Sequence, residues 1–354
     1  MAQLRRALFA CPLVLFVLEA PAQDGVPAPA AELKVLAPLV GNWTGRGVLR
    51  EPGDAETKWQ AACSYRWVLD GHFLREDLRV GFEGTADRLL AFAYLGWDRE
   101  NRRFVRLGVT NTGLAQLHTL RAGADGALTT LSLQRQHDQD YAERVALVVK
   151  GDTLRHTVDL LLPEGSSRAI VDGTFQRGGD AVEVGFGGAA FLGGAPHPDL
   201  ARLVKTAGRY TTEGLFAMGP GQPTVKITGT DDFRSGFGGL VLHGHTEGTA
   251  EGLPGHYIGE VFWAYDEVRQ CLVAHYLSNM GELMTMEGRW TKDGQLLATS
   301  HGLWNGEPMV QRMLMQFDDD GFPVGANSHS IVGTGAPYES FRATYRRQQP
   351  AKPH

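Results

Sequence analysis

The chain has 354 residues, a formal net charge of −6 and three cysteines. One hydrophobic core rarely organises so long a chain, so we expect two domains. The acidic balance, with no run of lysine and arginine, excludes a nucleic-acid-binding surface. The few cysteines exclude a disulfide-dense scaffold.

The N-terminus has the layout of a secretory signal. Arg5 and Arg6 precede an apolar run over residues 7–18, and Ala20 and Ala22 supply small residues at the positions that signal peptidase reads. A membrane-spanning helix needs about 20 apolar residues, so this run is too short to span. We expect cleavage after Ala22, export to the periplasm or the cell exterior, and a soluble mature chain without a membrane span.

Beyond the signal, the local patterns predict one short helix and a run of strands in each half of the chain. Residues 30–40 and 198–207 carry apolar side chains at helical spacing, and a glycine follows each segment. Breaks rich in aspartate and glycine recur at short intervals and indicate hairpin turns. Residues 155–160 alternate in polarity, with His156 on the apolar face. These patterns are typical of antiparallel strands.

The two halves of the chain repeat each other. Residues 94–98 (YLGWD) resemble residues 262–266 (FWAYD), and neighbouring positions correspond at a nearly constant offset. The repeated unit is too long for a solenoid repeat, so each copy should have its own core. The expected segments are a signal peptide 1–22, a disordered linker 23–31, a first domain 32–180, a Gly-rich linker 181–196, a second domain 197–347 and a disordered tail 348–354.

Several motifs match a known family. Residues 41–47 (GNWTGRG) are similar to the G-x-W opening of lipocalin-like proteins and to the G-x-W-x-G-x-G opening of nitrobindin-like barrels. Residues 67–74 (WVLDGHFL), the turns at 97–98 and 265–266, and the segment 279–288 resemble the pattern of the domain of unknown function 1579 family. The resemblance covers nearly the whole mature chain as two copies. It implies an all-β fold of two antiparallel lipocalin-like β-barrels in tandem, each preceded by a short helix, and no established activity.

The resemblance also implies how each barrel is closed. In lipocalin-like barrels the tryptophan of the opening motif packs at the closed end against an arginine of the last strand. Trp43 with Arg177, and Tyr210 with Arg346, could make this contact. We expect these residues to close the barrels rather than to bind a ligand.

Two histidines of the second copy are candidates for metal binding. One residue separates His243 from His245, so both side chains would lie on one side of a strand and could chelate Zn²⁺ or Cu²⁺. The equivalent Arg75 and Asp77 form a polar side, and no third ligand is fixed by spacing. The alternative is a solvated or hydrogen-bonded pair on a polar strand face. A haem site would need a histidine late in the barrel, where His329 is available.

The sulfur-containing residues have two interpretations each. Cys63 and Cys271, one in each copy, are expected as packed thiols, with a bridge between the domains as the alternative. A set of methionines at strand spacing belongs to the core or to the wall of an apolar pocket. The set comprises Met280, Met284, Met286, Met309, Met313 and Met315.

No catalytic motif points to an enzyme, because the chain contains no G-x-S-x-G nucleophile motif and no phosphate-binding loop. By analogy with the fold, we expect an exported protein that binds a small apolar ligand in one or both barrels without a cofactor. The alternatives are a metal- or haem-dependent enzyme that uses histidines of the second barrel, and a structural module that acts through its surfaces. The candidates for lining a ligand pocket are Trp97, Asn111, Tyr265, Asn279 and Met280.

Overall fold

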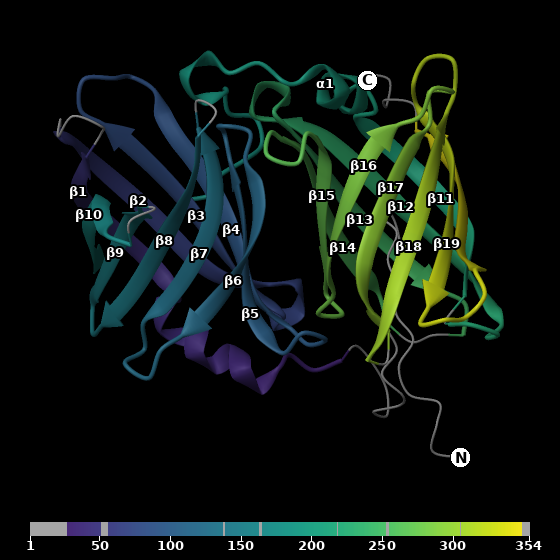
Figure 1. Ribbon diagram of the computed structural model, residues 1–354, viewed down its shortest axis with the longest axis horizontal. Coiled ribbons are helices and arrows are strands. Elements are labelled where there is room, and N and C mark those ends of the chain that lie inside the picture. The colour runs from purple at the N-terminus through teal and green to yellow at the C-terminus, as the bar shows by residue number, and fades with distance from the viewer. Residues whose placement is uncertain are drawn as a thin grey trace, which may run out of the picture. The chain divides into compact units, whose positions relative to one another are not determined.

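The computed structural model describes residues 27–50, 56–136, 139–162, 165–217, 219–252, 255–304 and 306–348. The expected signal peptide, residues 1–22, and residues 349–354 of the expected tail lie outside these ranges. Within them, no helix is both long and apolar enough to cross a membrane. The described chain forms two closed antiparallel β-barrels, each with its own hydrophobic core (Figure 1).

Barrel 1 is built from strands that pair with their sequence neighbours, and β1 closes the barrel by pairing with β10. Its strands are β1 (Gly41–Arg50), β2 (Glu56–Val68), β3 (Phe73–Phe82), β4 (Arg88–Asp98), β5 (Arg103–Thr110), β6 (Ala115–Ala122), β7 (Leu128–Gln136), β8 (Gln139–Lys150), β9 (Thr153–Leu161) and β10 (Ser167–Arg177). The short 3-10 helix η2 (Leu69–Gly71) joins β2 to β3.

Barrel 2 repeats this order, and β11 pairs with β20. Its strands are β11 (Gly208–Ala217), β12 (Thr224–Gly236), β13 (Val241–Ala250), β14 (Tyr257–Asp266), β15 (Cys271–Ser278), β16 (Leu283–Trp290), β17 (Leu296–Trp304), β18 (Glu307–Phe317), β19 (Pro323–Val332) and β20 (Tyr338–Arg347). The 3-10 helix η4 (Phe237–Gly239) stands where η2 stands in barrel 1.

The cores follow from the two-residue period of the strands. On β14, the alternate residues Tyr257, Val261 and Trp263 are buried in the core of barrel 2. On β2, Trp59 and Cys63 belong to the core of barrel 1. Each barrel therefore has one set of side chains that fills or lines its interior.

A short helix was expected before each barrel, and the structure differs before the first. The α-helix α1 (Pro198–Val204) precedes barrel 2, and the ring of His197 accepts a hydrogen bond from the backbone N–H of Asp199 at its start. The segment before barrel 1 is the 3-10 helix η1 (Ala31–Leu39), which contains Pro38. Because proline lacks an N–H and its ring clashes with the preceding turn, it disfavours an α-helix here.

The Gly-rich segment that we expected as a linker packs against barrel 1. The backbone N–H of Val182 donates to Ser64 Oγ at 2.7 Å, and that of Val184 donates to Asp77 Oδ1 at 3.0 Å. Both valine side chains are buried. We call residues 178–194, which include the 3-10 helix η3 (Phe191–Gly193), the strap. Asp77 alternates with the interior-facing Glu76 and therefore points outward. The strap, which binds Asp77, accordingly lies on the outer wall of the barrel.

The two remaining cysteines are free, buried thiols in separate barrels. The structure therefore contains packed thiols at Cys63 and Cys271 and no bridge between them.

Candidate functional site

The interior of barrel 1 holds a cluster of polar and charged side chains. Tyr65 and Glu76 are cross-strand partners on β2 and β3, and Arg106 and His118 are partners on β5 and β6. His156 on β9 lies opposite Gly173 of β10. All occupy positions that alternate into the barrel. We call these five residues the inner polar cluster.

An ion pair stands at the centre of the inner polar cluster. Arg106 Nη2 donates to Glu76 Oε2 at 2.9 Å, and the Tyr65 hydroxyl donates to Glu76 Oε1 at 2.9 Å. Both oxygens of Glu76 therefore have partners within the protein. Such partners are needed to keep a carboxylate charged inside a barrel.

The electrostatics keep this pair ionised and the imidazoles neutral. Burial would raise the pKa of Glu76, but Arg106 and its hydrogen bond hold that pKa below the ordinary value. Burial, together with the positive charge of Arg106, lowers the pKa of His118 to about 4. Burial is also the largest cause for His156, whose pKa falls to about 4 although Glu76 opposes the change. At neutral pH the cluster therefore has one positive and one negative charge.

Protein atoms do not cover the cluster completely. The Arg106 side chain keeps 22% of its surface accessible, and His118 and His156 are half-buried. Gly108, the next interior position on β5, makes room for the guanidinium, since a Cβ there would lie 3.0 Å from Arg106 Nη1. In the described part of the chain, neither imidazole has a hydrogen-bond partner. The cluster thus presents polar atoms to space inside the barrel that protein atoms do not fill.

Apolar side chains surround the cluster toward the end of the barrel away from η1. Trp59 lies over Gly47 and Gly173, where a Cβ would approach the indole ring to 2.4 and 2.2 Å. Phe82 is the cross-strand partner of Trp59 and packs 6.0 Å from Phe191 of the strap, measured between ring centroids. Leu49, Leu89 and Val171 complete this apolar region. An interior with few polar groups and an apolar wall is typical of small-molecule sites.

Barrel 2 has apolar residues or glycine at every equivalent position. The pair Tyr65 and Glu76 corresponds to Phe233 and Gly244, and the pair Arg106 and His118 corresponds to Ala274 and Met286. His156 corresponds to Ala326, because β9 and β19 pair in the same way with the last strand. All five residues of barrel 2 are buried.

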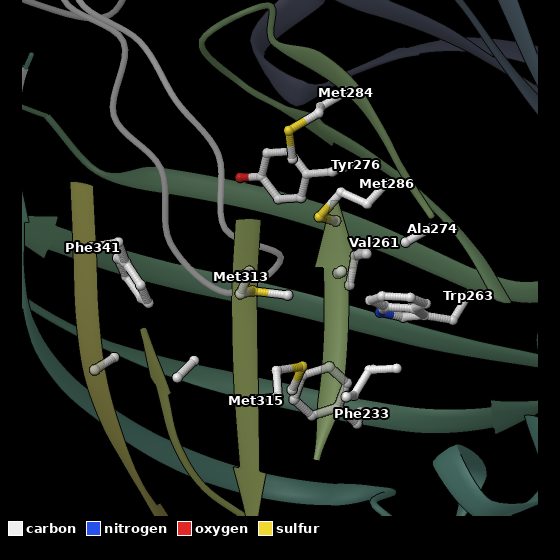
Figure 2. Packing of buried hydrophobic residues seen from close by; sticks show 14 of the residues in the cluster. Phe233, Val261, Trp263, Ala274, Tyr276, Met284, Met286, Met313, Met315 and Phe341 are labelled. Carbon is white, nitrogen blue, oxygen red and sulfur yellow. The ribbon is translucent and has the colours of Figure 1, made fainter. Parts of the chain in front are cut away.

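The interior of barrel 2 is filled by large side chains (Figure 2). A Cβ at Gly244 would lie 2.6 Å from the ring of Phe233, and one at Gly288 would lie 2.8 Å from Trp263. Because these glycines have no side chain, the aromatic rings can occupy the space beside them. All six methionines of the predicted set belong to this core. The structure thus favours the core interpretation of the methionines.

A carboxyl group is buried inside barrel 2. Asp231 accepts hydrogen bonds from the hydroxyls of Thr212 and Thr246, the latter at 2.6 Å. Burial raises the pKa of Asp231 to about 7 even though both hydroxyls oppose the change. Its equivalent in barrel 1 is Cys63, since Cys63 pairs with Trp43 and Asp231 pairs with the equivalent Tyr210. Asp231 is enclosed rather than accessible.

The structure does not bring the predicted pocket residues together. Trp97 lies near the end of β4, in edge contact with Phe104, whereas Asn111 binds the backbone of Leu90 near the start of that strand. The side chain of Asn111 bonds to backbone groups and thereby joins the β5–β6 turn to β4.

The same separation occurs in barrel 2. Tyr265 stacks on His197 at 3.5 Å near α1, whereas Asn279 binds the backbone of Ile258 and His256 at the other end of β14. Met280 is buried in the core. The two asparagines therefore have equivalent backbone-binding positions, at the opposite end of the strand from the aromatic residue.

The closure contacts differ between the barrels. The Arg177 guanidinium lies 4.1 Å from the centre of the Trp43 ring, and the indole N–H donates to Leu39 O at 2.8 Å. In barrel 2, the cross-strand partner of Tyr210 is Arg347, whereas Arg346 is exposed and pairs with Thr211. A shift of one residue on a strand reverses the side-chain direction, so Arg346 is not at the closure position.

His243 and His245 lie on the outward-facing side of β13 and share a carboxylate. His243 Nε2 contacts Glu260 Oε2, and His245 Nδ1 lies 2.9 Å from Glu260 Oε1. The hydrogen bond to Glu260 raises the pKa of His245 to about 9. Among the described residues, no group of three or more histidine, cysteine or acidic side chains could hold a metal ion. The pair is thus hydrogen-bonded through Glu260, a residue that the sequence analysis did not include.

The inner polar cluster was also missed, although part of it had a signal. The alternation of residues 155–160 put His156 on an apolar face, and Glu76 lies between Arg75 and Asp77 of the polar side. A polar residue on the apolar face of a strand indicates a buried site. Arg106 and His118 stand on strands for which no such pattern was recognised.

A family model now accounts for the repeat. The model described as "Protein of unknown function (DUF1579)" matches residues 28–177 and again residues 195–347. The chain belongs to this family. The match confirms the resemblance seen in the sequence and its occurrence as two copies. No curated protein matches the chain.

Several solved structures are similar to the DUF1579 chain at low identity. Rv2717c from M. tuberculosis is 15% identical, with 42% of this chain and 99% of that chain covered and a TM-score of 0.33. The S-type phycobiliprotein lyase CPES from Guillardia theta is 10% identical, with 43% and 94% covered and a TM-score of 0.33. A protein of unknown function from the DUF3598 family of Nostoc punctiforme is 11% identical, with 90% and 100% covered and a TM-score of 0.25.

Proposed function

We propose that barrel 1 is a binding compartment for a small, largely apolar molecule that carries one hydrogen-bonding group. One observation carries this proposal: Arg106, His118 and His156 are only partly buried inside barrel 1, while the same positions in barrel 2 are apolar and buried. Barrel 2 then serves as a filled scaffold domain.

The physical argument rests on the cost of burying polar groups. A polar group removed from water without a partner costs about 1–3 kcal/mol, so a cluster of this kind needs either solvent or a ligand. Apolar residues at the same positions avoid this cost, as barrel 2 demonstrates. Retaining Arg106, His118 and His156 as partly uncovered polar groups inside the barrel therefore favours a binding role over a role in stability.

The proposal includes export and requires no cofactor. The pattern of residues 1–22 supports a cleaved signal, and N-terminal sequencing of the secreted protein would test cleavage after Ala22. Metal analysis of the purified full chain tests the absence of a cofactor, since stoichiometric metal would contradict this part of the proposal.

Fluorescence titration of the full chain with prodan, a small neutral fluorescent ketone, tests the binding role. The double variant Arg106→Ala with His118→Met gives barrel 1 the residues of barrel 2 at these positions. The matched control is Met286→Leu, which changes the equivalent of His118 in the core of barrel 2. We expect saturable binding to the natural chain and the control, and at least a tenfold loss of affinity in the double variant. Equal affinity in all three proteins would overturn the proposal.

A further inference from the structure

Within the inner polar cluster, Arg106 gives the unpaired polar atoms an excess of hydrogen-bond donors. Glu76 has both oxygens engaged, by Arg106 and by Tyr65. The Arg106 guanidinium uses one N–H for this contact, and its remaining donors have no acceptor among the described residues. The unpaired donors of Arg106 therefore favour a ligand group that accepts hydrogen bonds.

The charge of the site restricts the acceptor further. Arg106 and Glu76 cancel, and burial keeps the pKa values of His118 and His156 at about 4, so both rings are neutral above pH 5. The site therefore has no net charge to balance an anion.

The residues next to the imidazoles add no further charge. Tyr65 and Cys63 of β2 have pKa values that burial raises, so both stay neutral. Leu147 of β8 and Gly173 of β10, the cross-strand neighbours of His156, do not titrate. Glu143 of β8 and Arg168 of β10 have opposite charges and lie farther along, both opposite Leu160.

We propose that Glu76 is an internal counter-ion that makes the site select an uncharged hydrogen-bond acceptor, such as a ketone or ester carbonyl, over a carboxylate. This inference rests on the proposed binding function of barrel 1. Arg106 donates to the carbonyl, and the imidazole of His118 or His156 can donate a second hydrogen bond. Glu76 is thus a specificity-determining residue, held in place by Tyr65 and Arg106.

The preference follows from the cost of an uncompensated charge. A carboxylate bound beside Arg106 would bring a second negative charge next to Glu76 in a partly desolvated interior, where repulsion is weakly screened. Such a ligand would either bind as the protonated, neutral acid or not bind at all. A neutral carbonyl accepts the same hydrogen bond from Arg106 without this penalty.

Competition against bound prodan at pH 8 tests the inference, with methyl dodecanoate and dodecanoate as probes of equal chain length. In the natural chain we expect the ester to compete at least tenfold better than the acid. Glu76→Gln leaves the charge of Arg106 uncompensated, so we expect the acid to gain at least tenfold relative to the ester. Tyr65→Phe is the matched control, because it removes a hydrogen bond to Glu76 without changing the charge, and it should retain the ester preference.

A second measurement does not depend on the folding of a variant. In the natural chain, lowering the pH from 8 to 5 should strengthen competition by the acid, which binds with a proton, and leave the ester unchanged. Stronger competition by the acid at pH 8, or failure of both probes while prodan binds through Arg106, would overturn the counter-ion inference alone. If prodan binding does not depend on Arg106 and His118, the result contradicts the proposed binding function of barrel 1 and therefore also the counter-ion inference.

Discussion

Glu76 and Gly244 occupy equivalent positions on β3 and β13, and they have opposite effects on the barrel interior. Glu76 carries a charge inward and needs Arg106 and Tyr65 as partners. Gly244 has no side chain, so the Phe233 ring occupies the space. The two copies diverge through such single positions, while the strand register is retained.

The packing around Gly244 predicts a loss of stability on substitution. In Gly244→Ala, the new Cβ would lie 2.6 Å from Phe233 and 2.7 Å from Val261, both enclosed in the core. We expect the free energy of unfolding, measured by urea denaturation, to fall by about 1–3 kcal/mol. Gly108→Ala is the control, because its Cβ would meet the movable end of Arg106. A Gly244→Ala variant as stable as the natural chain would contradict the filled core.

Asp231 predicts an unusual pH dependence of stability. Burial raises its folded-state pKa to about 7, above the unfolded value of about 4, so the folded chain binds this proton more tightly. Ionisation of Asp231 therefore lowers the free energy of unfolding. This loss is absent below pH 4 and grows as the pH rises toward 7, by about 1.4 kcal/mol per unit of pKa shift.

The variant Asp231→Asn cannot ionise and should escape this penalty. Its melting temperature relative to the natural chain should therefore rise between pH 5 and pH 8. Asp232→Asn is the control, since the neighbouring Asp232 pairs with exposed Arg234. A difference between Asp231→Asn and the natural chain that is constant with pH would show that Asp231 titrates normally.

At the scale of elements, hydrogen bonds from Arg177 hold η1 against the end of barrel 1. It donates to Val40 O at 2.6 Å and to Pro38 O at 2.9 Å, and its guanidinium lies over Trp43. It also donates to Asp152 of the β8–β9 turn at 3.1 Å. One side chain thus holds together the helix, the first strand and a turn.

Replacing Arg177 should release η1. Arg177→Leu removes these charge-assisted hydrogen bonds and the ring contact, and we expect a loss of about 2 kcal/mol in unfolding free energy. Amide exchange should increase first in residues 31–40. Arg144→Leu is the control, because its ion pair with Asp159 is half-exposed and worth less than about 1 kcal/mol. Equal effects of both variants would contradict the closure role of Arg177.

The sequence predicted the elements better than the contacts between them. Alternation put His156 on an inward face, and the repeat indicated two barrels, which the structure contains. The neighbours of His156 were beyond prediction, because Glu76 and Arg106 come from strands far apart in the chain and meet only through barrel closure and register. Glycine content predicted a linker over residues 181–196, but it could not indicate that Ser64 and Asp77 bind the strap.

At the scale of the whole molecule, the DUF1579 chain contains two copies of one barrel with different interiors. Barrel 1 retains a buried ion pair and neutral imidazoles, which stabilise a fold less than apolar residues do. Barrel 2 replaces them with Phe233, Ala274, Met286 and Ala326 and is densely filled. The proposed function thus assigns binding to one copy and a filled, stabilising core to the other.

The most direct test of the division between the two barrels is a crystal structure of the full chain grown with prodan. The account predicts one bound molecule in barrel 1, with its ketone oxygen within hydrogen-bond distance of Arg106 and its rings near Trp59. Barrel 2 should remain filled by its own side chains. Prodan inside barrel 2, or a barrel 1 interior that excludes prodan while the molecule binds elsewhere, would contradict the account.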